Sequence, residues 1–467
     1  MQEQLKEIQE KLIKALRSWA LGRGFDPSEA RNLRHKAILF NHRHYMDSIS
    51  VYRRIAAEEG CGRDSDVQTI KARLMLHADI FKSYDQNWLD NADYNKMNQW
   101  LSGIFHKAVN VDMTEVKTID GWIEALDRAG IYVTYSSGTS GAFSFVPRDK
   151  EEWELSRMAN MAYLAPLLAH RLQGGNLSRH FVQSAFRLLP IDRLVKITAK
   201  KVLLDYDAAF LGFKSGRMGN QALIQELAPL FNNCCFLYDM DISGTALRSL
   251  RRGARTDEER LIIKVLQDKI IGQRQENYSK LIDNIEKSSA KGQNMLIFGA
   301  PYQFKELCEL SAATNRKIML KEGSLVVLGG GWKSFTGEAI GHDALIDMLS
   351  KTLHIQPDMI LEGYSMTETS ALTLRCKYGR FHIPPIIEPV IFNDALNPLE
   401  GDDLKGSFGF MDSLAGSHPG FIISDDYVHM VNSDCECGLH GPAILEIGRL
   451  PGSEVKGCGG IMGSFSA

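Results

Sequence analysis

The chain has 467 residues, of which 44% are hydrophobic and 24% are charged, and its formal net charge at pH 7 is −3. This composition is typical of a globular protein with enough chain for several domains. The low net charge excludes electrostatic attraction to nucleic acid or to an anionic membrane as the main basis of function. No apolar run approaches the length of a membrane span. The N-terminus lacks the charged-then-apolar order of a secretory signal, and eight cysteines fit a reducing compartment, so we expect a cytoplasmic protein.

Residues 1–120 are predicted to be helical. The first helix places its apolar residues at helical spacing with charged residues between them, at Leu5, Ile8, Leu12, Leu16 and Trp19. We therefore expect residues 1–120 to form a helical region that packs on the core of the protein.

Residues 121–448 are predicted to form an α/β domain, because short apolar strands alternate with helices. The expected strands are Ile131–Tyr135, Val202–Leu204, Cys234–Tyr238, Met295–Phe298, Leu325–Leu328 and Met359–Leu361. The longest expected helix runs from about Thr256 to Lys291, with Leu261, Val265, Leu281 and Ile285 at its apolar positions. This alternation predicts a mostly parallel sheet flanked by helices, followed by a β-rich part after about residue 380 and a short tail at 449–467.

A polar, glycine-containing loop follows the first expected strand. It consists of Ser136, Ser137, Gly138, Thr139, Ser140 and Gly141. Its glycines allow backbone N–H groups to converge on one point, and its hydroxyl groups add hydrogen-bond donors that a phosphate chain can use. The Walker pattern is absent, and an ordinary turn is the alternative interpretation.

A second loop, of three glycines, follows the expected strand Leu325–Leu328. It consists of Gly329, Gly330 and Gly331. A turn without side chains allows a flat ligand to approach the main chain, and a tight strand-to-helix turn is the alternative.

The third loop, Tyr364–Glu368, also follows an expected strand. Tyr364 offers a ring for stacking on a purine, Thr367 a hydroxyl for a phosphate oxygen, and Glu368 an oxygen ligand for Mg²⁺. Two alternatives compete: a capped helix start, or a hydrolase elbow in which Ser365 is the nucleophile.

With these three loops in this order, the chain resembles the adenylate-forming enzymes, the superfamily that includes acyl-CoA ligases and luciferases. The resemblance implies binding of ATP and Mg²⁺ at a phosphate loop, an adenine loop and a Tyr-Gly-Met-Thr-Glu-like segment. It also implies that ribose is held by residues further along the chain, at Asp425, Asp426 and Arg449.

Within that superfamily the details are most similar to the acyl-protein synthetases of bacterial fatty-acid reductase systems, with phenylacetate-CoA ligase-like enzymes next. The motifs are Thr139-Ser140-Gly141, Phe298–Pro301, Gly329–Lys333, Gly379–Pro385 and Lys456-Gly457-Cys458. The resemblance implies that a carboxylic acid is activated as an acyl-adenylate. It also implies that the acyl group is then transferred to Cys458 before it passes to a reductase or carrier protein, and that Thr367 and Glu368 are catalytic. The flanking glycines and Lys456 suit a reactive thiolate.

Two departures from the family pattern leave alternatives open. Gly448-Arg449 resembles the Gly-Arg motif of the family and only residues 450–467 follow it, so we expect the usual full C-terminal domain of about 100 residues to be lacking. The phosphate loop also lacks the usual Pro-Lys, which leaves Arg148 or Lys150 as candidate cations for the pyrophosphate. The same adenylation with CoA, a carrier protein or an amine as acceptor is one alternative, and a non-catalytic nucleotide-binding protein is another.

A possible zinc site combines two cysteines separated by one residue, Cys435-Glu436-Cys437, with two upstream residues, Cys376 and His382. Three cysteines and one histidine are one of the usual sets of four ligands in structural zinc sites. His429 and His440 are rival ligands, and thiols without a metal are the alternative interpretation. The other cysteines are expected to be core or surface thiols, at Cys61, Cys234, Cys235 and Cys308.

Overall fold

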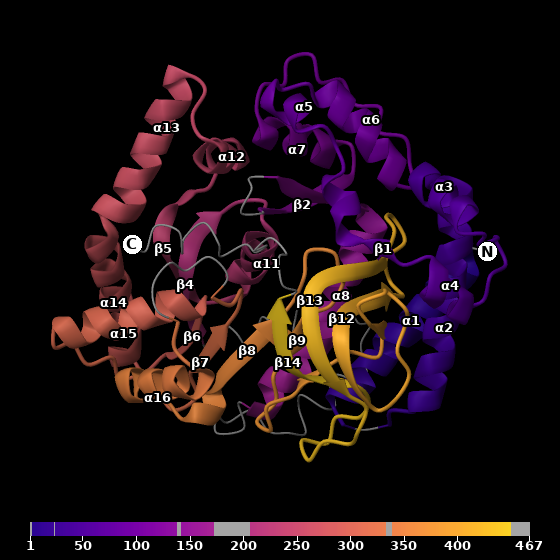
Figure 1. The fold of residues 1–467 in the computed structure, drawn as a ribbon. Coiled ribbons are helices and arrows are strands. Elements are labelled where there is room, and N and C mark those ends of the chain that lie inside the picture. The colour runs from indigo at the N-terminus through magenta and orange to yellow at the C-terminus, as the bar shows by residue number, and fades with distance from the viewer. Residues whose placement is uncertain (1, 23, 138–141, 172–205, 333–338, 450–467) are drawn as a thin grey trace. The chain divides into compact units, whose positions relative to one another are not determined.

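The computed structural model describes residues 2–22, 24–137, 142–171, 206–332 and 339–449 (Figure 1). The chain folds into two compact units, each built from separate stretches of sequence. Among the described residues, unit 1 contains 2–135, 144–167 and 365–449, and unit 2 contains 136–137, 142–143, 168–171, 206–332 and 339–364. The domain boundaries predicted from the sequence near residues 120 and 448 stay predictions.

Unit 1 begins with a series of helices, as predicted. They are α1 (Gln2–Ala20), α2 (Pro27–Ser48), α3 (Ser50–Glu58), α4 (Val67–Arg73), α5 (Gln86–Asp90), α6 (Tyr94–Ile104) and α7 (Ile119–Arg128). On α1 the predicted apolar positions Leu12, Leu16 and Trp19 are buried. Several of these helices start at a side chain that accepts a hydrogen bond from the first turn, as Asp26 does from the N–H groups of Ser28 and Glu29. Such capping explains where the helices begin.

The β-rich part predicted after residue 380 is an antiparallel sheet in unit 1. Its strands are β11 (Ile387–Phe392), β12 (Asp403–Asp412), β13 (Phe421–Val431), β14 (Ala443–Arg449) and β10 (Phe381–His382), paired in the order β10-β14-β13-β12-β11. The short strand β1 (Leu76–His77) runs parallel to β13. Unit 1 also holds most of the two-stranded sheet of β2 (Ile131–Ser137) and β3 (Phe143–Asp149), and the helix α8 (Lys150–Arg171) starts directly after it.

Unit 2 contains the predicted parallel sheet. Its strands are paired in the order β5 (Asn233–Asp241), β4 (Tyr206–Ser215), β6 (Asn294–Gly299), β7 (Leu325–Leu328) and β8 (Ile360–Tyr364), and every neighbouring pair is parallel. Its helices are α11 (Gly219–Leu227), α12 (Gly244–Arg252), α13 (Asp257–Gln267), α14 (Arg274–Ala290), α15 (Pro301–Ala313) and α16 (His342–Leu353). Strands alternating with helices around a parallel sheet confirm the predicted α/β class.

Most expected strands coincide with observed ones. The strand β7 has the predicted bounds, whereas Met359 belongs to a 3₁₀ turn that precedes β8. The expected strand Val202–Leu204 lies outside the described residues. The strand β4 was not predicted. It contains a carboxylate, Asp207, which is buried and accepts hydrogen bonds from Asn232 and Asn233.

The prediction of one continuous helix from Thr256 to Lys291 is wrong. Instead α13 and α14 are separated by a π-helical turn over Asp268–Gly272. Leu281 and Ile285 on α14 are buried as expected, but Leu261 and Val265 on α13 are 62% and 48% exposed. Helical spacing shows which residues share a face, and it does not show whether another element covers that face.

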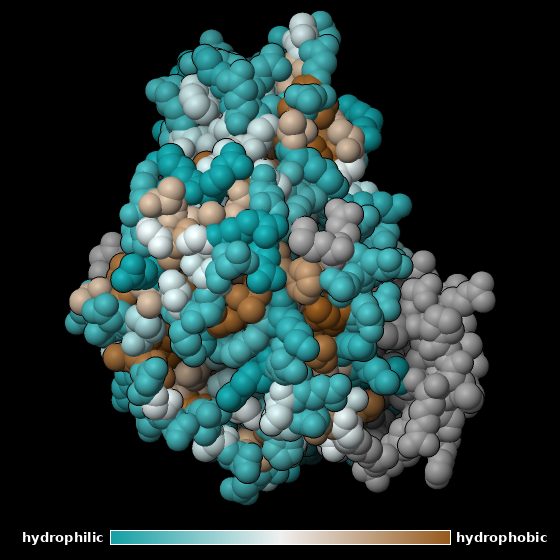
Figure 2. Space-filling model, turned by 90° about the vertical axis from the view of Figure 1, so that its right-hand side faces the viewer, coloured by the Kyte–Doolittle hydropathy of each residue, from teal (hydrophilic) through white to brown (hydrophobic). Residues whose placement is uncertain are grey.

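No helix among the described residues is long and apolar enough to cross a lipid bilayer. The face of the molecule in Figure 2 is largely hydrophilic, and its hydrophobic side chains lie in small separate groups.

A buried carboxylate joins the helices of unit 1 to its antiparallel sheet. Glu388 on β11 forms ion pairs with Arg34 and His35 of α2 and with Lys71 of α4. Arg34 also donates a hydrogen bond of 2.8 Å to the carbonyl of Pro385. Burial alone would raise the pKa of Glu388, but His35, Arg34 and Lys71 together hold it well below its usual value. The carboxylate is therefore ionised and stabilises the docking of two helices on the sheet.

We expect Glu388→Gln to lower the free energy of unfolding by about 3–5 kcal/mol at pH 7, because it leaves Arg34 and Lys71, whose side chains are only 12% and 14% exposed, without their partner. Urea unfolding followed by tryptophan fluorescence measures the loss. Because the folded pKa of Glu388 is lowered, its contribution is present above the unfolded pKa of about 4.3 and is lost as the pH falls below that value. The wild type should therefore lose stability more steeply than the variant under acid.

The control is Glu7→Gln on α1, which removes a carboxylate whose ion pair with Lys11 is exposed. Its unfolding midpoint should equal that of the wild type. Equal midpoints for the Glu388 and Glu7 variants would contradict the proposed docking role.

Candidate functional site

Residues 365–372 connect the end of β8 to the short strand β9 (Thr373–Leu374) and carry Thr367 and Glu368. The segment forms turns, one of them closed by a bond from the Thr369 N–H to the Met366 carbonyl. It contains no helix, so neither the capped helix start nor the strand–turn–helix of a nucleophile elbow at Ser365 is present there. Glu368 is 8% exposed, so its carboxylate is mostly withdrawn from water.

The backbone of this segment is held by polar side chains of unit 1. The Arg148 guanidinium on β3 donates to the Thr367 carbonyl at 2.6 Å. The Asp412 carboxylate on β12 accepts from the Ser370 N–H at 2.7 Å. These side chains had no signal in the sequence, apart from Arg148, which was considered only as a cation for pyrophosphate.

The residues expected to hold ribose lie on neighbouring strands of unit 1. Asp425 and Asp426 are on β13 and are both buried, and Arg449 lies opposite Asp426 in the antiparallel register of β13 and β14. His77 of β1 places its Nε2 3.2 Å from the Asp425 carboxylate, because β1 runs beside β13 in parallel. Sequence reasoning missed His77, since nothing in the sequence connects it to Asp425.

The glycine loop of unit 2 lies at the edge of the parallel sheet that the carboxyl ends of its strands form. Gly329 directly follows β7, and its N–H bonds to the Gly299 carbonyl at 2.9 Å. Gly330 and Gly331 have φ angles of 84° and 63°, which L side chains rarely adopt. Tyr364 ends the adjacent strand β8, so these residues lie at the carboxyl ends of neighbouring parallel strands, where α/β proteins bind ligands.

The phosphate loop is described only in part. Ser136 and Ser137 are the last residues of β2. The remaining predicted residues, Gly138, Thr139, Ser140 and Gly141, lie outside the described residues, and so does Cys458.

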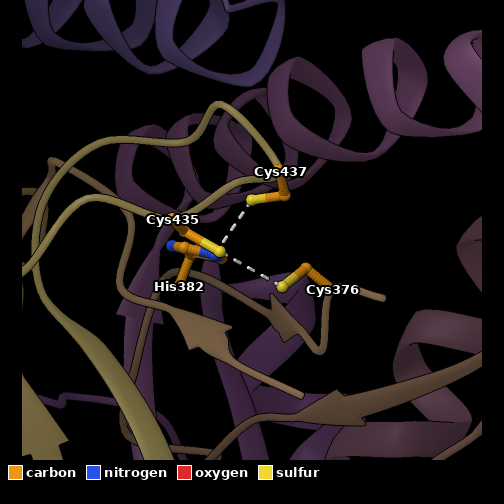
Figure 3. Close-up of side chains that lie close together, drawn as sticks. All are labelled: Cys376, His382, Cys435 and Cys437. Carbon is orange, nitrogen blue, oxygen red and sulfur yellow. Dashed lines mark hydrogen bonds between the residues drawn. The ribbon is translucent and has the colours of Figure 1, made fainter. Parts of the chain in front are cut away.

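The four predicted metal ligands lie together in unit 1 (Figure 3). Their ligand atoms are all within 4.8 Å of one another. The Cys376 and Cys435 sulfur atoms are 3.8 Å apart, and the Cys437 sulfur atom is 3.2 Å from Nε2 of His382. His382 and Cys435 are buried and the other two are half-buried. The cluster is thus a compact set of three thiols and one imidazole.

Two tight turns bring these residues together. Gly379 has a φ of 77° and bonds through its N–H to the Cys376 carbonyl, which turns the chain back toward His382. Gly438 has a φ of 84° and bonds in the same way to the Cys435 carbonyl. In both places the glycine provides a left-handed conformation that other residues rarely adopt.

The rival ligands lie elsewhere. His429 is 2.7 Å from the Asp403 carboxylate and His440 is 3.3 Å from that of Asp434, so the structure favours His382 as the fourth residue of the cluster.

The other described cysteines behave as ordinary thiols. Cys61 and Cys308 are buried, and Cys234 and Cys235 on β5 are half-buried. Burial raises the pKa of Cys235 to about 12 and that of Cys234 to about 11, which keeps both protonated and unreactive at neutral pH.

Comparison with known proteins supports the resemblance seen in the sequence. A family model described as "Acyl-protein synthetase, LuxE" matches residues 270–465. Long-chain-fatty-acid–luciferin-component ligases of Vibrio harveyi and Aliivibrio fischeri are each 21% identical, over 184 and 185 residues. Each alignment covers 39% of this chain and 48% of the relative, so the chain spans about half the length of the curated relatives it matches. The predicted resemblance to the acyl-protein synthetases is therefore confirmed over residues 270–465.

Solved structures of ligases are also similar. An open conformation of 2-hydroxyisobutyryl-CoA ligase in complex with 2-HIB-AMP and CoA aligns with a TM-score of 0.46 at 11% identity, covering 93% of this chain and 83% of that one. A long-chain-fatty-acid-CoA ligase of Archaeoglobus fulgidus aligns with a TM-score of 0.36 at 10% identity, covering 68% and 51%.

Proposed function

We propose that this chain is an ATP-dependent ligase that activates a carboxylic acid as an acyl-adenylate and then transfers the acyl group to a thiol. The observation that carries the proposal is the match of residues 270–465 to the acyl-protein synthetases. That span includes the glycine loop at Gly329, the Tyr364–Glu368 segment and the strands that carry Asp425 and Arg449. The name of the curated relatives favours a long-chain fatty acid as substrate. A reductase or carrier protein as partner, and a cytoplasmic location, are further parts of the proposal and rest on the family resemblance.

In the proposed reaction, an oxygen of the substrate carboxylate attacks the α-phosphorus of ATP, and the bond to the bridging oxygen breaks to release pyrophosphate. Glu368 would hold Mg²⁺, which supplies positive charge to the phosphate oxygens. The Thr367 hydroxyl would donate to a phosphate oxygen, Tyr364 would stack on adenine, and Asp425 with Asp426 would accept hydrogen bonds from the ribose hydroxyls. A mostly buried carboxylate such as Glu368 interacts with a cation more strongly than an exposed one, because water screens it less.

We expect Glu368→Ala to reduce acid-dependent pyrophosphate release about 100-fold or more, since one electrostatic contact at the reacting phosphate is lost. The assay measures pyrophosphate released from Mg-ATP with a panel of fatty, aromatic and amino acids. The control, Glu400→Ala, removes an exposed carboxylate of unit 1 and should leave the rate unchanged. A turnover rate of the Glu368 variant near that of the wild type would contradict the assignment of Glu368 as the magnesium ligand.

For the second half of the reaction, we propose that the Cys458 thiolate attacks the acyl carbon of the adenylate. A thioester forms and AMP leaves. Cys458→Ser should therefore retain acid-dependent pyrophosphate release but lose covalent labelling by radioactive acid and Mg-ATP, a label that hydroxylamine removes from the wild type. Cys234→Ser, at a half-buried thiol of β5, should keep the label. Acyl transfer that is insensitive to Cys458→Ser would instead indicate CoA, a carrier protein or an amine as the direct acceptor.

We further propose that Cys376, His382, Cys435 and Cys437 hold a structural zinc ion. Sulfur ligands at about 2.3 Å from zinc in a tetrahedron lie about 3.8 Å from each other, and the Cys376–Cys435 separation is 3.8 Å. Four protein ligands leave no position for substrate, so such a site stabilises the fold and does not catalyse. The ion would join β10 to the turn between β13 and β14.

We expect the purified protein to contain about one zinc ion per chain, measured by inductively coupled plasma mass spectrometry. Cys437→Ser should lose the zinc and lower the thermal midpoint, because a four-ligand site contributes directly to folding. Cys61→Ser, at a buried thiol outside the cluster, should keep the zinc. A metal-free wild type whose thermal midpoint is unchanged by chelators would contradict the proposal.

A further inference from the structure

A cluster of buried ionisable side chains contacts the segment that carries Thr367 and Glu368. It consists of Arg148 on β3, Glu152 in the first turn of α8 and His418 between β12 and β13, all in unit 1. Their side chains are 4%, 3% and 0% exposed. One oxygen of Glu152 lies 3.2 Å from Nε of Arg148 and 3.2 Å from Nδ1 of His418.

The Glu152 carboxylate is bound on its other side as well. Its second oxygen accepts hydrogen bonds from the N–H groups of Gly416 at 2.8 Å and Ser417 at 2.6 Å. Burial alone would raise the pKa of Glu152, but His418, Arg148 and the Ser417 N–H together lower it. The carboxylate therefore stays ionised and balances the charge of the guanidinium.

The guanidinium of Arg148 points its other donors at backbone and hydroxyl groups. Nη2 donates to the Thr367 carbonyl at 2.6 Å and Nη1 donates to Thr134 Oγ1 on β2 at 3.2 Å. The planar group has a rigid arrangement of donors, so fixing Nε and Nη1 also fixes the direction of Nη2. The Thr367 carbonyl belongs to the peptide bond that leads into Glu368.

The other end of the segment is held independently. Ser370 donates its N–H to Asp412, and its carbonyl accepts hydrogen bonds of 3.2 Å from Ser156 and Asn160 of α8. The Leu372 N–H bonds to Asn160 at 3.0 Å. Loss of the Arg148 contact should therefore loosen residues 366–369 and leave 370–374 in place.

We infer that Arg148 is a positioning residue: it fixes the Thr367 carbonyl and thereby the direction of the Glu368 side chain, while Glu152 and His418 hold the guanidinium in its orientation. This role differs from the pyrophosphate contact considered from the sequence, because a side chain that is 4% exposed and paired with Glu152 uses its charge inside the protein. The effect on catalysis rests on the proposed role of Glu368, whereas the effect on the segment does not.

The test compares Arg148→Lys with Arg34→Lys. Both variants keep the positive charge and lose a guanidinium of unit 1 that is paired with a buried glutamate, with side chains 4% exposed for Arg148 and 12% for Arg34, but Arg34 pairs with Glu388 on β11. Hydrogen–deuterium exchange of free protein measures the amides of residues 366–369 and 370–374 separately. Steady-state pyrophosphate release measures kcat and the KM for ATP.

We expect amide exchange at 366–369 to rise about 10-fold in Arg148→Lys, as fits the loss of one charge-assisted hydrogen bond, with no rise at 370–374 or in Arg34→Lys. We expect kcat to fall about 10- to 100-fold with little change in the KM for ATP, because a displaced catalytic group affects the reacting geometry more than binding. If Arg148→Lys fails to fold, Glu152→Gln provides the same test, since it releases the guanidinium from its partner.

Exchange at 366–369 equal to that of the Arg34 control would overturn the inference. So would a raised KM for ATP with unchanged exchange, because that result indicates a direct contact with pyrophosphate. If the wild type releases no pyrophosphate with any acid, the proposed function fails, and the exchange data alone then support or overturn the anchoring by Arg148.

Discussion

The ionised carboxylate of Glu152 is the constraint on which the segment of Thr367 and Glu368 depends. Burying a charge costs several kcal/mol, and this cost is offset only if every partner is in place. Here the partners come from β3, through Arg148, and from the stretch between β12 and β13, through His418 and the N–H groups of Gly416 and Ser417. A different packing of these elements would leave the charge without partners. The cluster therefore selects one arrangement of the elements, even where its net contribution to stability is small.

The same principle joins the helices near the N-terminus to the rest of unit 1. Asp149 at the end of β3 is buried and receives Lys107 at 2.8 Å and His106 at 3.0 Å, while its N–H bonds to the Ser417 hydroxyl. Burial alone would raise the pKa of Asp149, but these partners hold it well below its usual value. With Glu388, this contact explains why the helices that precede β2 belong to one compact unit with the antiparallel sheet.

Local patterns in the sequence predicted local structure, and contacts between distant residues were missed for a physical reason. Apolar runs such as Leu325–Leu328 correspond to strands, and two of the glycines that follow this strand, Gly330 and Gly331, have positive φ angles. The cysteine cluster was also predictable, because the chemistry of thiols and imidazole restricts the candidates to few residues. Charged residues such as Glu152 and His418 give no such signal, because most charged residues lie at the surface. On α13 the error has the opposite sense, because side chains that were expected to be buried are exposed. Amphipathic spacing does not show whether another element covers the apolar face.

The segment from Thr367 to His382 is fixed at successive points, and this has a consequence for the proposed catalysis. Arg148 holds its start, the Tyr163 hydroxyl accepts the Leu374 N–H at 2.9 Å, and the cysteine cluster holds its end. Trp19 of α1 stacks on Tyr163 and packs against His382, so the first helix supports two of these points. The entropy of ordering this backbone is lost once, during folding, and not in each catalytic cycle. If Glu368 holds Mg²⁺ as proposed, its carboxylate would meet the ion already oriented, and preorganisation of this kind is the usual source of electrostatic catalysis.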